Sequence, residues 1–419
     1  MIAEILSTGD EIRCGTIIDS NSAYIAQRLE EAGIEVARHC CVGDDINIII
    51  AVLSEISSRA NIAVVTGGLG PTADDLTAEA AAKAAGVELV FDKKAYGFLE
   101  EFFKKRSIPM SNSNRKQAFL PKGAEILHNP VGTASGFYLK FGKCLFFFLP
   151  GVPYEMRLML SEAVLPQIEK LRHDSHKSIQ VKSLSCFGIK ESAAGEMLAG
   201  LNEKFPDIKL GLRAEFPEIQ IKLYGSGRDE KSLCDHMKKA VQWVLEKLGE
   251  KVFSVDGSSM EAVVGRLLIK KRATVALAES CTGGLISDKL TNIPGSSEYF
   301  LFSGVTYSNE SKIEVLGVSP DSLKRYGAVH EAVARQMAEG ARRIAGATYG
   351  VATSGIAGPG GGTADKPVGT VCIGLAAPGY TKGFRFNFSF GRRSMNKNIF
   401  AMKALDLLRL DLLNALEHS

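Results

Sequence analysis

Apolar and polar positions divide the chain into three blocks with different periodicities. The first block alternates between short apolar runs, which predict strands, and segments with an apolar residue every three or four positions, which predict helices. The predicted strands are residues 2–7, 34–41 and 62–66, and the predicted helices are residues 20–32, 46–57 and 76–85. The alternation predicts a three-layer αβα domain, built on a mainly parallel sheet, over residues 1–170.

The second block, residues 177–254, mixes strands with one long amphipathic helix. Its predicted strands are residues 179–186, 208–213 and 219–224, and its predicted helices are residues 191–201 and 230–248. This pattern indicates a small α+β module. The polar stretches at residues 171–178 and 254–259 are expected to be its hinges.

The third block, residues 258–419, returns to an α/β pattern. Ser258 and Glu261 have the spacing of a capping box, and an apolar helix face follows them. Further strands are expected at residues 273–278, 302–307, 349–354 and 368–375, and helices at residues 331–344 and 396–413. Residues 384–390 alternate strictly and predict a half-buried strand. The block is expected to be a second, independent α/β domain.

Composition indicates how many domains to expect and which kinds of partner are not expected. The chain has 419 residues, which is long enough for two or three domains, and 45% of them are hydrophobic. A net charge of +3 gives no reason to expect a nucleic-acid or membrane partner. No secretory start is recognisable, and the eight cysteines include no CxxC pair. We therefore expect a cytoplasmic protein with reduced thiols and no zinc site.

Polar turns follow each of the first three predicted strands, at residues 7–12, 42–45 and 66–75. In an open parallel sheet such turns meet at one edge, where ligands bind. Glycine amides there can close on a phosphate, whereas the neighbouring carboxylates would repel it. A divalent metal, Mg²⁺ or a similar ion, would allow carboxylates and phosphate to lie together, because it would bind both and so hold a diphosphate. The glycines are Gly67, Gly68 and Gly70, and the expected metal ligands are Asp10, Asp44, Asp74 and Asp75. The alternative is that the aspartates only cap helices.

A second candidate site begins at Ser280, between a buried strand and a helix. Its hydroxyl could attack a carbonyl while the amides of Thr282, Gly283 and Gly284 hold the oxyanion. The alternative is that Ser280 or Thr282 is only a helix cap. Cys281 is a competing nucleophile, but its position favours packing inward.

A serine nucleophile without a nearby histidine needs another base, and Lys312 is the candidate. It lies at the end of the next strand with Tyr307 and Asn309, and a glycine-rich loop at residues 353–370 follows another strand. That loop matches neither a P-loop nor GxGxxG, but it remains a fair cradle for a phosphate or a ribose. The alternative for Lys312 is an ordinary solvated lysine.

The first block resembles the molybdopterin-binding fold as found in the CinA (competence/damage-inducible) family. The motifs that carry the resemblance are STGDEI, DSNSAYIAQRL, VVTGGLGPTADDLT and FLPGVPYEM. The resemblance implies metal-dependent cleavage of ADP-ribose to AMP and ribose 5-phosphate. It also implies that Thr72, Lys116 and the glycine amides contact the substrate. The same fold serves proteins that bind molybdopterin, so the motifs alone leave both roles open.

The third block resembles the CinA carboxy-terminal domain, a nicotinamide-nucleotide amidase. The motifs are AESCTGG, PGSS, VTYSNESK, YGAVHEAV, SGIAGPGGG and KPVGTV. The resemblance implies hydrolysis of nicotinamide mononucleotide (NMN) to nicotinate mononucleotide and ammonia, without a cofactor. Ser280 would be the nucleophile and Lys312 its base. The other implied site residues are Tyr307, Ser354, Asn309, Gly355, Gly358, Gly360 and Arg393.

Two features of the resemblance qualify the assignment. Arg392 and Lys397 stand where the family usually has an acid and a second arginine, which leaves Arg393 as the expected phosphate contact. The second block resembles a KH-like connecting domain, but it contains no GXXG loop and is expected to be a spacer or a dimer element.

The sequence thus predicts a homodimeric enzyme of pyridine-nucleotide salvage. Two alternatives stay open: a molybdopterin-binding protein, and an interaction protein of DNA uptake or damage response without hydrolase activity.

Overall fold

Buried apolar strands form the centre of the N-terminal unit in the computed structural model, which describes residues 1–172, 178–227 and 229–417. The six-stranded sheet has the order β2-β1-β3-β8-β7-β6. Its first four strands are parallel, and β7 pairs antiparallel with both β8 and β6. The strands are β1 Ile2–Thr8, β2 Glu35–Val42, β3 Ile62–Thr66, β6 Glu125–Leu127, β7 Gly136–Phe141 and β8 Cys144–Leu149. The expected sheet is therefore confirmed at its parallel core and extended by an antiparallel edge.

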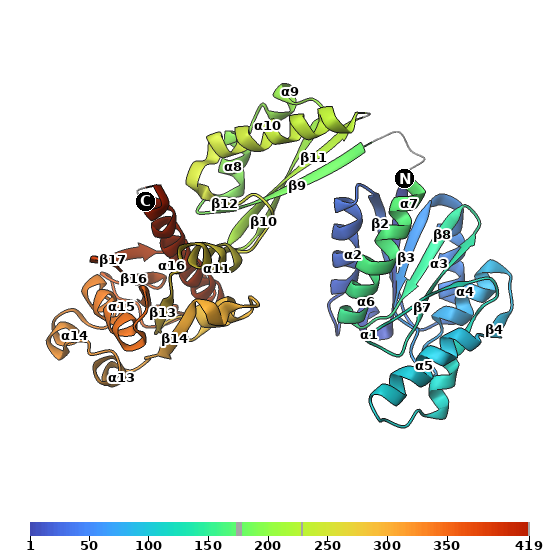
Figure 1. Ribbon diagram of the computed structural model, residues 1–419, viewed down its shortest axis with the longest axis horizontal. Coiled ribbons are helices and arrows are strands. Elements are labelled where there is room, and N and C mark those ends of the chain that lie inside the picture. Colours follow the sequence, from blue (N-terminus) through green and yellow to red (C-terminus); the bar gives the residue numbers. More distant parts are fainter. Residues whose placement is uncertain (173–177, 228, 418–419) are drawn as a thin grey trace. The chain divides into compact units, whose positions relative to one another are not determined.

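Helices cover both faces of this sheet, which gives the predicted three layers (Figure 1). Apolar side chains of α2 Ser20–Glu31, α6 Pro153–Met159 and α7 Leu165–Arg172 pack on one face. Those of α3 Ile46–Arg59, α4 Thr77–Ala85 and α5 Lys93–Lys105 pack on the other. The remaining elements are α1 Asp10–Arg13, η1 Asn112–Ala118, η2 Leu160–Val164 and the small sheet of β4 Leu89–Phe91 with β5 Phe119–Pro121.

The middle module is a four-stranded sheet of order β10-β11-β9-β12 with helices packed against it. Its elements are β9 Ser178–Phe187, α8 Glu191–Met197, α9 Leu201–Lys204, β10 Ile208–Glu215, β11 Glu218–Gly227, α10 Glu230–Leu248, η3 Gly249–Lys251 and β12 Val252–Ser254. The single helix expected at residues 191–201 is wrong at its end: the chain turns at Gly200, which has φ +89°, and starts α9. Most of the hinge expected at residues 171–178 lies outside the described residues.

The C-terminal domain contains a five-stranded sheet of order β14-β13-β15-β16-β17. Parallel pairing joins β13 to β14 and β15, whereas β15, β16 and β17 are antiparallel neighbours. The strands are β13 Val275–Glu279, β14 Phe300–Val305, β15 Tyr349–Gly355, β16 Thr370–Ala377 and β17 Tyr380–Asn387. The strand expected at residues 384–390 therefore lies earlier in the chain. The alternating phenylalanines continue past its end because their rings still pack on the core.

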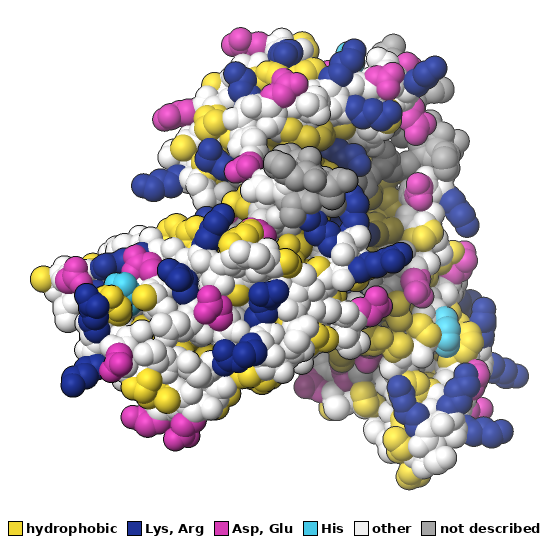
Figure 2. Space-filling model, turned by 60° about the vertical axis from the view of Figure 1, so that its left-hand side comes forward, with side chains coloured by type: hydrophobic (Ala, Val, Ile, Leu, Met, Phe, Trp, Pro, Cys, Tyr) yellow, Lys and Arg dark blue, Asp and Glu magenta, His cyan; other side chains and the backbone are white. Residues whose placement is uncertain are grey.

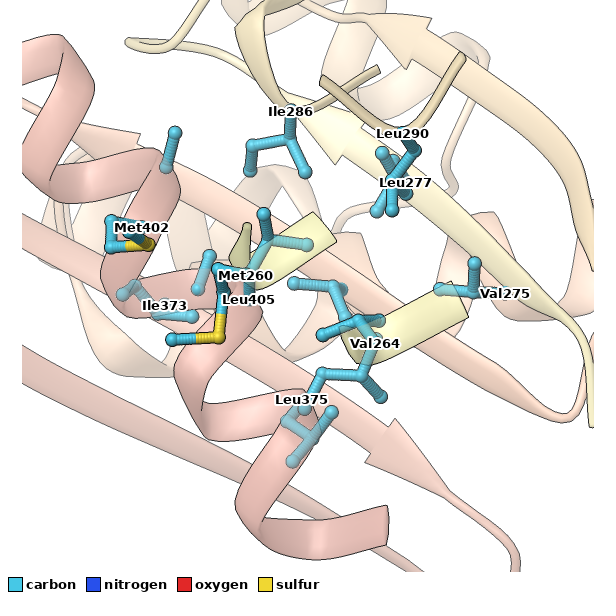
Figure 3. Close-up of a cluster of buried hydrophobic side chains, with 14 of the residues drawn as sticks. Met260, Val264, Val275, Leu277, Ile286, Leu290, Ile373, Leu375, Met402 and Leu405 are labelled. Carbon is cyan, nitrogen blue, oxygen red and sulfur yellow. The ribbon is translucent and has the colours of Figure 1, made fainter. Parts of the chain in front are cut away.

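One face of this sheet carries the largest apolar cluster, part of which Figure 3 shows. Met260 and Val264 of α11 belong to one apolar cluster with Leu277 of β13 and Leu405 of α16, and Met260 lies beside Leu405 in this view. The helices on this face are α11 Met260–Lys271, α12 Leu285–Thr291 and α16 Arg393–Glu417. The opposite face is covered by α14 Pro320–Tyr326 and α15 Glu331–Ala345, and α13 Asn309–Glu314 and η4 Ser296–Glu298 complete the domain.

The predicted capping box before α11 is wrong. Ser259 occupies the N-cap position, and no side chain caps it. Ser258 instead donates its amide to Ser254 and Asp256, and its hydroxyl accepts from Arg266. The polar SVDGSS segment thus satisfies its own backbone.

The described chain shows neither a membrane-spanning helix nor an obvious basic stripe on the face in Figure 2. None of its described helices is long and apolar enough to cross a membrane. On that face, lysines and arginines are interspersed with acidic side chains.

Candidate active sites

Ser280 lies where β13 ends, in a tight turn that leads into α12. Its amide donates to the carbonyl oxygen of Thr353 on β15 at 2.9 Å, and its side chain is 8% exposed. Gly283 and Gly284 have φ angles of +60° and +91°, which explains why glycine suits both positions of the turn. The turn presents the Ser280 hydroxyl to a cavity.

Lys312 reaches the same hydroxyl from α13. Its Nζ lies 3.2 Å from Ser280 Oγ. It also lies 2.9, 3.0 and 3.3 Å from the carbonyl oxygens of Thr306, Tyr307 and Ser308. The side chain is 1% exposed, and no ion pair of the described residues includes it. Lys312 is therefore not the ordinary solvated lysine of the alternative interpretation.

Burial lowers the pKa of Lys312 because the charged amine loses its hydration. A neutral amine carries two N–H donors and one lone pair. It can donate to two of the carbonyls and accept the hydroxyl proton of Ser280. The arrangement is that of an activated nucleophile and its base.

Glu279, the last residue of β13, changes the expected role of the helix start. Its carboxylate accepts from the amides of Gly284 at 3.0 Å, Ile286 at 3.1 Å and Ser287 at 2.9 Å, and from the Ser287 hydroxyl at 2.6 Å. The prediction that Gly284 offers a free amide is therefore wrong.

The amides of Thr282 and Gly283 have no hydrogen-bond acceptor among the described residues. Thr282 is fully buried, backbone included, and its hydroxyl lies 2.7 Å from that of Thr353. Gly283 is exposed, so its amide remains the candidate oxyanion donor.

A cavity of about 280 Å³ opens beside Ser280 and Lys312. The residues expected from the sequence that line it are Ser280, Lys312, Tyr307, Ser354, Gly355, Gly358, Gly360 and Arg393. Thr282, Gly283 and Gly284 do not line it, and neither does Asn309, which starts α13 on the exposed side. Ser354 donates its hydroxyl to the carbonyl of Ala328 at 2.7 Å, which makes it part of the wall.

Arg393, at the start of α16, also lines this cavity. Its guanidinium donates to the Gly358 carbonyl at 2.7 Å and to the Tyr307 hydroxyl at 3.2 Å. Sequence reasoning missed Asn396, a buried side chain that donates to the carbonyls of Ala357 and Phe390 and so holds the glycine-rich loop. The position of this asparagine in an otherwise apolar helix was the sequence feature that could have indicated its role.

The two residues that depart from the family pattern occupy different places. Arg392 lies outside the cavity lining. Lys397 brings its Nζ to 3.6 Å from the point where a Cβ on Gly283 would lie, so its ammonium lies beside the turn that carries the free amides.

Cys281 lies in the apolar cluster and is 5% exposed. Burial raises the pKa of its thiol to about 12. Because the thiolate is the reactive form of cysteine, this residue is a poor nucleophile at neutral pH. Cys281 also lines the cavity, so the raised pKa of its thiol is the reason for preferring Ser280 as the nucleophile.

The N-terminal unit has a cavity of about 510 Å³ at the carboxyl ends of its parallel strands. All three predicted turns contribute to it. The expected residues that line it are Gly67, Gly68, Gly70, Asp44, Asp74 and Asp75. A Cβ on Gly67 would lie 2.3 Å from the Thr8 carbonyl oxygen, so this glycine is required by close packing of two strand ends.

Three predicted residues of this site lie outside the lining. Asp10 forms an ion pair with Arg13 at 3.0 Å, and its amide donates to Asp44. Thr72 donates its amide and hydroxyl to Asp75. Lys116 donates to the Thr72 carbonyl. Thr72 and Lys116 therefore stabilise the glycine-containing loop in this structure rather than face the cavity.

The charge of the remaining acids suits a cation. Burial raises the pKa of Asp44, and the nearby carboxylates of Asp10, Glu11 and Asp74 raise it further, although a hydrogen bond from the Asp10 amide opposes them. Within the described residues, no three acidic, imidazole or thiol side chains are gathered in ligand positions. Mg²⁺ is commonly held by one or two carboxylates together with substrate phosphates and water, so the acids fit such an ion.

Sequence reasoning also missed Asn21, at the start of α2. Its side-chain amide donates to the Gly151 carbonyl at 2.7 Å and to the Thr66 hydroxyl at 3.2 Å, which ties three loops of the cavity together. The signal was the polar DSNS run before the helix.

Three family models match the chain. They are "Probable molybdopterin binding domain" over residues 4–170, "Damage-inducible protein CinA KH domain" over residues 181–254 and "CinA C-terminal domain" over residues 257–412. Together they cover nearly the whole sequence.

Curated relatives match over the full length. A "CinA-like protein" of Desulfosudis oleivorans is 53% identical over 99% of this chain and 100% of its own. Another, of Geobacter metallireducens, is 44% identical over 99% and 100%. Among solved structures, the protein CinA of Thermoplasma acidophilum, titled "with unknown function", is 33% identical, covers 40% of this chain and 96% of its own, and has a TM-score of 0.37.

Proposed function

The chain belongs to the CinA family, and from this premise we propose that its C-terminal domain hydrolyses the amide of NMN to give nicotinate mononucleotide and ammonia. The observation that carries the proposal is the 3.2 Å approach of the buried Lys312 amine to the Ser280 hydroxyl. A cavity bordered by an arginine and a glycine-rich loop surrounds the pair.

In the first half of the reaction, Ser280 Oγ attacks the amide carbon while its proton passes to Lys312 Nζ. The negative charge moves to the carbonyl oxygen, where the Gly283 amide stabilises it. Lys312, now an ammonium, returns the proton to the amide nitrogen, and ammonia leaves. An ester between Ser280 and the nicotinoyl group remains.

In the second half, water replaces ammonia and attacks the ester. Lys312 accepts a proton from this water and returns it to Ser280 Oγ as the ester bond breaks. The products are the pyridine carboxylate and the regenerated hydroxyl. No step requires a metal, so the reaction is expected to continue in a chelator.

The substrate phosphate is expected at Arg393. Arg393 offers a guanidinium, which pairs well with phosphate oxygens. Tyr307, whose hydroxyl accepts a hydrogen bond from Arg393, is 61% exposed. Its side chain is therefore free to move together with Arg393. Binding there would orient the ring toward Ser280.

The test is ammonia release from NMN by the full-length protein. We expect release by the unaltered protein and none by Ser280→Ala, with similar thermal unfolding of the two. A retained rate in Ser280→Ala, or no release by the folded unaltered protein, would contradict the proposal.

For the N-terminal domain we propose metal-dependent cleavage of ADP-ribose to AMP and ribose 5-phosphate. The supporting observation is a cavity that combines close-packed glycines with the carboxylates of Asp44, Asp74 and Asp75. These acids would hold a divalent ion such as Mg²⁺, which supplies charge neutralisation to the diphosphate when bound. The glycine amides would bind the remaining phosphate oxygens.

AMP release with and without Mg²⁺ tests this second proposal. Asp75→Ala should abolish it and leave ammonia release unchanged, whereas Ser280→Ala should do the reverse. A folded protein that binds molybdopterin but releases no AMP would instead support a binding role. A protein with neither activity would favour an interaction role in competence or damage response.

Both proposed substrates are breakdown products of NAD, which supports a place in pyridine-nucleotide salvage. Light scattering of the full-length protein tests the expected homodimer.

A further inference from the structure

Glu279 is a fully buried carboxylate next to the proposed nucleophile, and the reaction above gives it no role. It ends a strand whose other residues, Val275 to Ala278, are apolar. A charged group in such a place is costly unless hydrogen bonds replace its lost hydration. Glu279 has four such bonds, all from the first residues of α12 and the glycine before it.

The four partners of Glu279 are all donors. Gly284 and Ile286 donate to Oε2, and the amide and hydroxyl of Ser287 donate to Oε1. Only an acceptor on both oxygens can satisfy this set, so a carboxylate fits and a carboxamide does not. The Ser287 hydroxyl, whose proton goes to Glu279, accepts from the Ser303 hydroxyl of β14 at 2.6 Å, which links the cap to the next strand.

The turn that carries Ser280 is held at its other side as well. The Ser280 amide donates to the Thr353 carbonyl at 2.9 Å, and the hydroxyls of Thr282 and Thr353 lie 2.7 Å apart. Glu279 thus fastens the end of the turn, and β15 fastens its beginning. Between these two anchors lies the amide of Gly283.

We propose that Glu279 is a positioning residue for the amidase reaction: by binding the start of α12 it aims the Gly283 amide at the carbonyl oxygen that Ser280 attacks. The inference rests on the proposed amidase function. It also accounts for the choice of oxyanion donor, because the later amides of the helix are already occupied by the chain's own carboxylate.

The variants that test this role differ in what they offer the four donors. Glu279→Gln keeps the size but turns an NH₂ group toward N–H donors, so the turn loses part of its anchor. Glu279→Asp keeps an acceptor on both oxygens but is shorter by one methylene. Asp92→Asn is the matched control, because Asp92 caps α5 in the N-terminal domain through the amides of Lys94 and Ala95.

We expect Glu279→Gln to lower kcat for NMN by about 100-fold, the typical cost of a misplaced oxyanion donor, with KM changed less than about threefold. Glu279→Asp should recover part of the lost kcat. Asp92→Asn should lower the unfolding temperature without changing kcat. A merely structural cap would lower the folded fraction and leave kcat per folded molecule unchanged.

A second measurement does not depend on the natural substrate. A small organophosphonate that reacts with activated serines should label Ser280, as mapped by mass spectrometry. We expect its rate constant to fall in Glu279→Gln, because the phosphonyl oxygen uses the same amide.

The two measurements separate the two hypotheses. If the unaltered protein is labelled at Ser280 but releases no ammonia from NMN, the proposed substrate is wrong while the role of Glu279 can still be measured. If folded Glu279→Gln retains both the kcat and the labelling rate of the unaltered protein, the positioning role is refuted.

Discussion

Replacing Lys312 with methionine removes the proposed base and retains most of the buried apolar stem. The amine has four polar neighbours within 3.3 Å: the Ser280 hydroxyl and the carbonyls of Thr306, Tyr307 and Ser308. Lys312→Met leaves all four without this partner. The variant therefore tests both the chemistry and the local stability.

The expected loss of activity follows from the first of these contacts. A positioned general base contributes about 10² to 10⁴ in rate, and Lys312 also orients the nucleophile. We expect kcat to fall by at least about 10³-fold, which corresponds to ~4 kcal/mol in the activation barrier. Lys312→Arg should be equally inactive at every pH, because a guanidinium stays protonated.

The pH dependence of stability has a definite sign. Burial lowers the pKa of Lys312 in the folded state, so between that pKa and the unfolded value near 10.5 the unfolded chain binds more protons. The unaltered protein should therefore gain stability as the pH rises through this window. Lys312→Met lacks the gain, and its unfolding temperature should fall increasingly behind that of the unaltered protein.

The assay is ammonia release from NMN between pH 6 and pH 10, together with thermal unfolding at both ends of the range. Lys403→Met is the matched control: its amine pairs with Asp406 and lies 20% exposed on α16, away from the cavity. That variant should keep its activity. Activity of folded Lys312→Met within about tenfold of the unaltered protein would refute the serine–lysine mechanism.

Three further outcomes are expected. Cys281→Ala should keep most of the amidase activity, because burial raises the pKa of that thiol to about 12; loss of activity in a folded variant would reopen the choice of nucleophile. Arg393→Ala should raise KM for NMN by about 10- to 100-fold but leave KM for nicotinamide riboside, which lacks the phosphate, unchanged. Asp44→Asn should abolish Mg²⁺-dependent AMP release. In a chelator the same variant should raise the unfolding temperature, because burial and neighbouring acids raise the pKa of Asp44 and make its negative charge unfavourable. A lower unfolding temperature would contradict this account of the clustered acids.

The sequence predicted elements best where apolar periodicity and burial coincide. The strand at Ile62–Thr66 and the helix at Glu230–Leu248 have the expected bounds, because each is defined by its own residues. The strand expected at residues 384–390 was displaced. Its alternating phenylalanines report burial of their rings, which continues after the backbone has left the sheet.

The features of the candidate sites also divide into those that the sequence predicts and those that it does not. Ser280 and Lys312 meet because β13 and β14 are parallel neighbours, so the residues after each strand lie at one edge of the sheet. That arrangement follows from the α/β pattern and the family motifs. The hydrogen bond from the Gly284 amide to Glu279 could not be predicted from the sequence, because strand periodicity gives no information on the direction of the side chain at the end of a strand.

The wrong expectations for Thr72, Lys116 and Asn309 have the same cause. Each residue belongs to a recognisable motif, but a motif specifies the residue type and not the direction of its side chain. Lys116 donates to the backbone of the loop it was expected to serve, and Asn309 lies outside the cavity. Side-chain direction in a turn depends on contacts with distant segments, which the local sequence does not specify.

The proposed substrate would itself assist the proposed base. The ring of NMN is a pyridinium, and attack by Ser280 would place this positive charge close to Lys312, whose amine already touches the hydroxyl. A nearby like charge disfavours the ammonium form and adds to the effect of burial, so binding should lower the pKa of Lys312 further. Because kcat/KM reports the free enzyme and kcat the complex, the alkaline rise of kcat should lie at lower pH than that of kcat/KM. A dihydropyridine analogue, whose ring is neutral, should show no such separation. Coincident profiles for NMN itself would mean that the ring charge does not act on Lys312, and this part of the reasoning would be refuted.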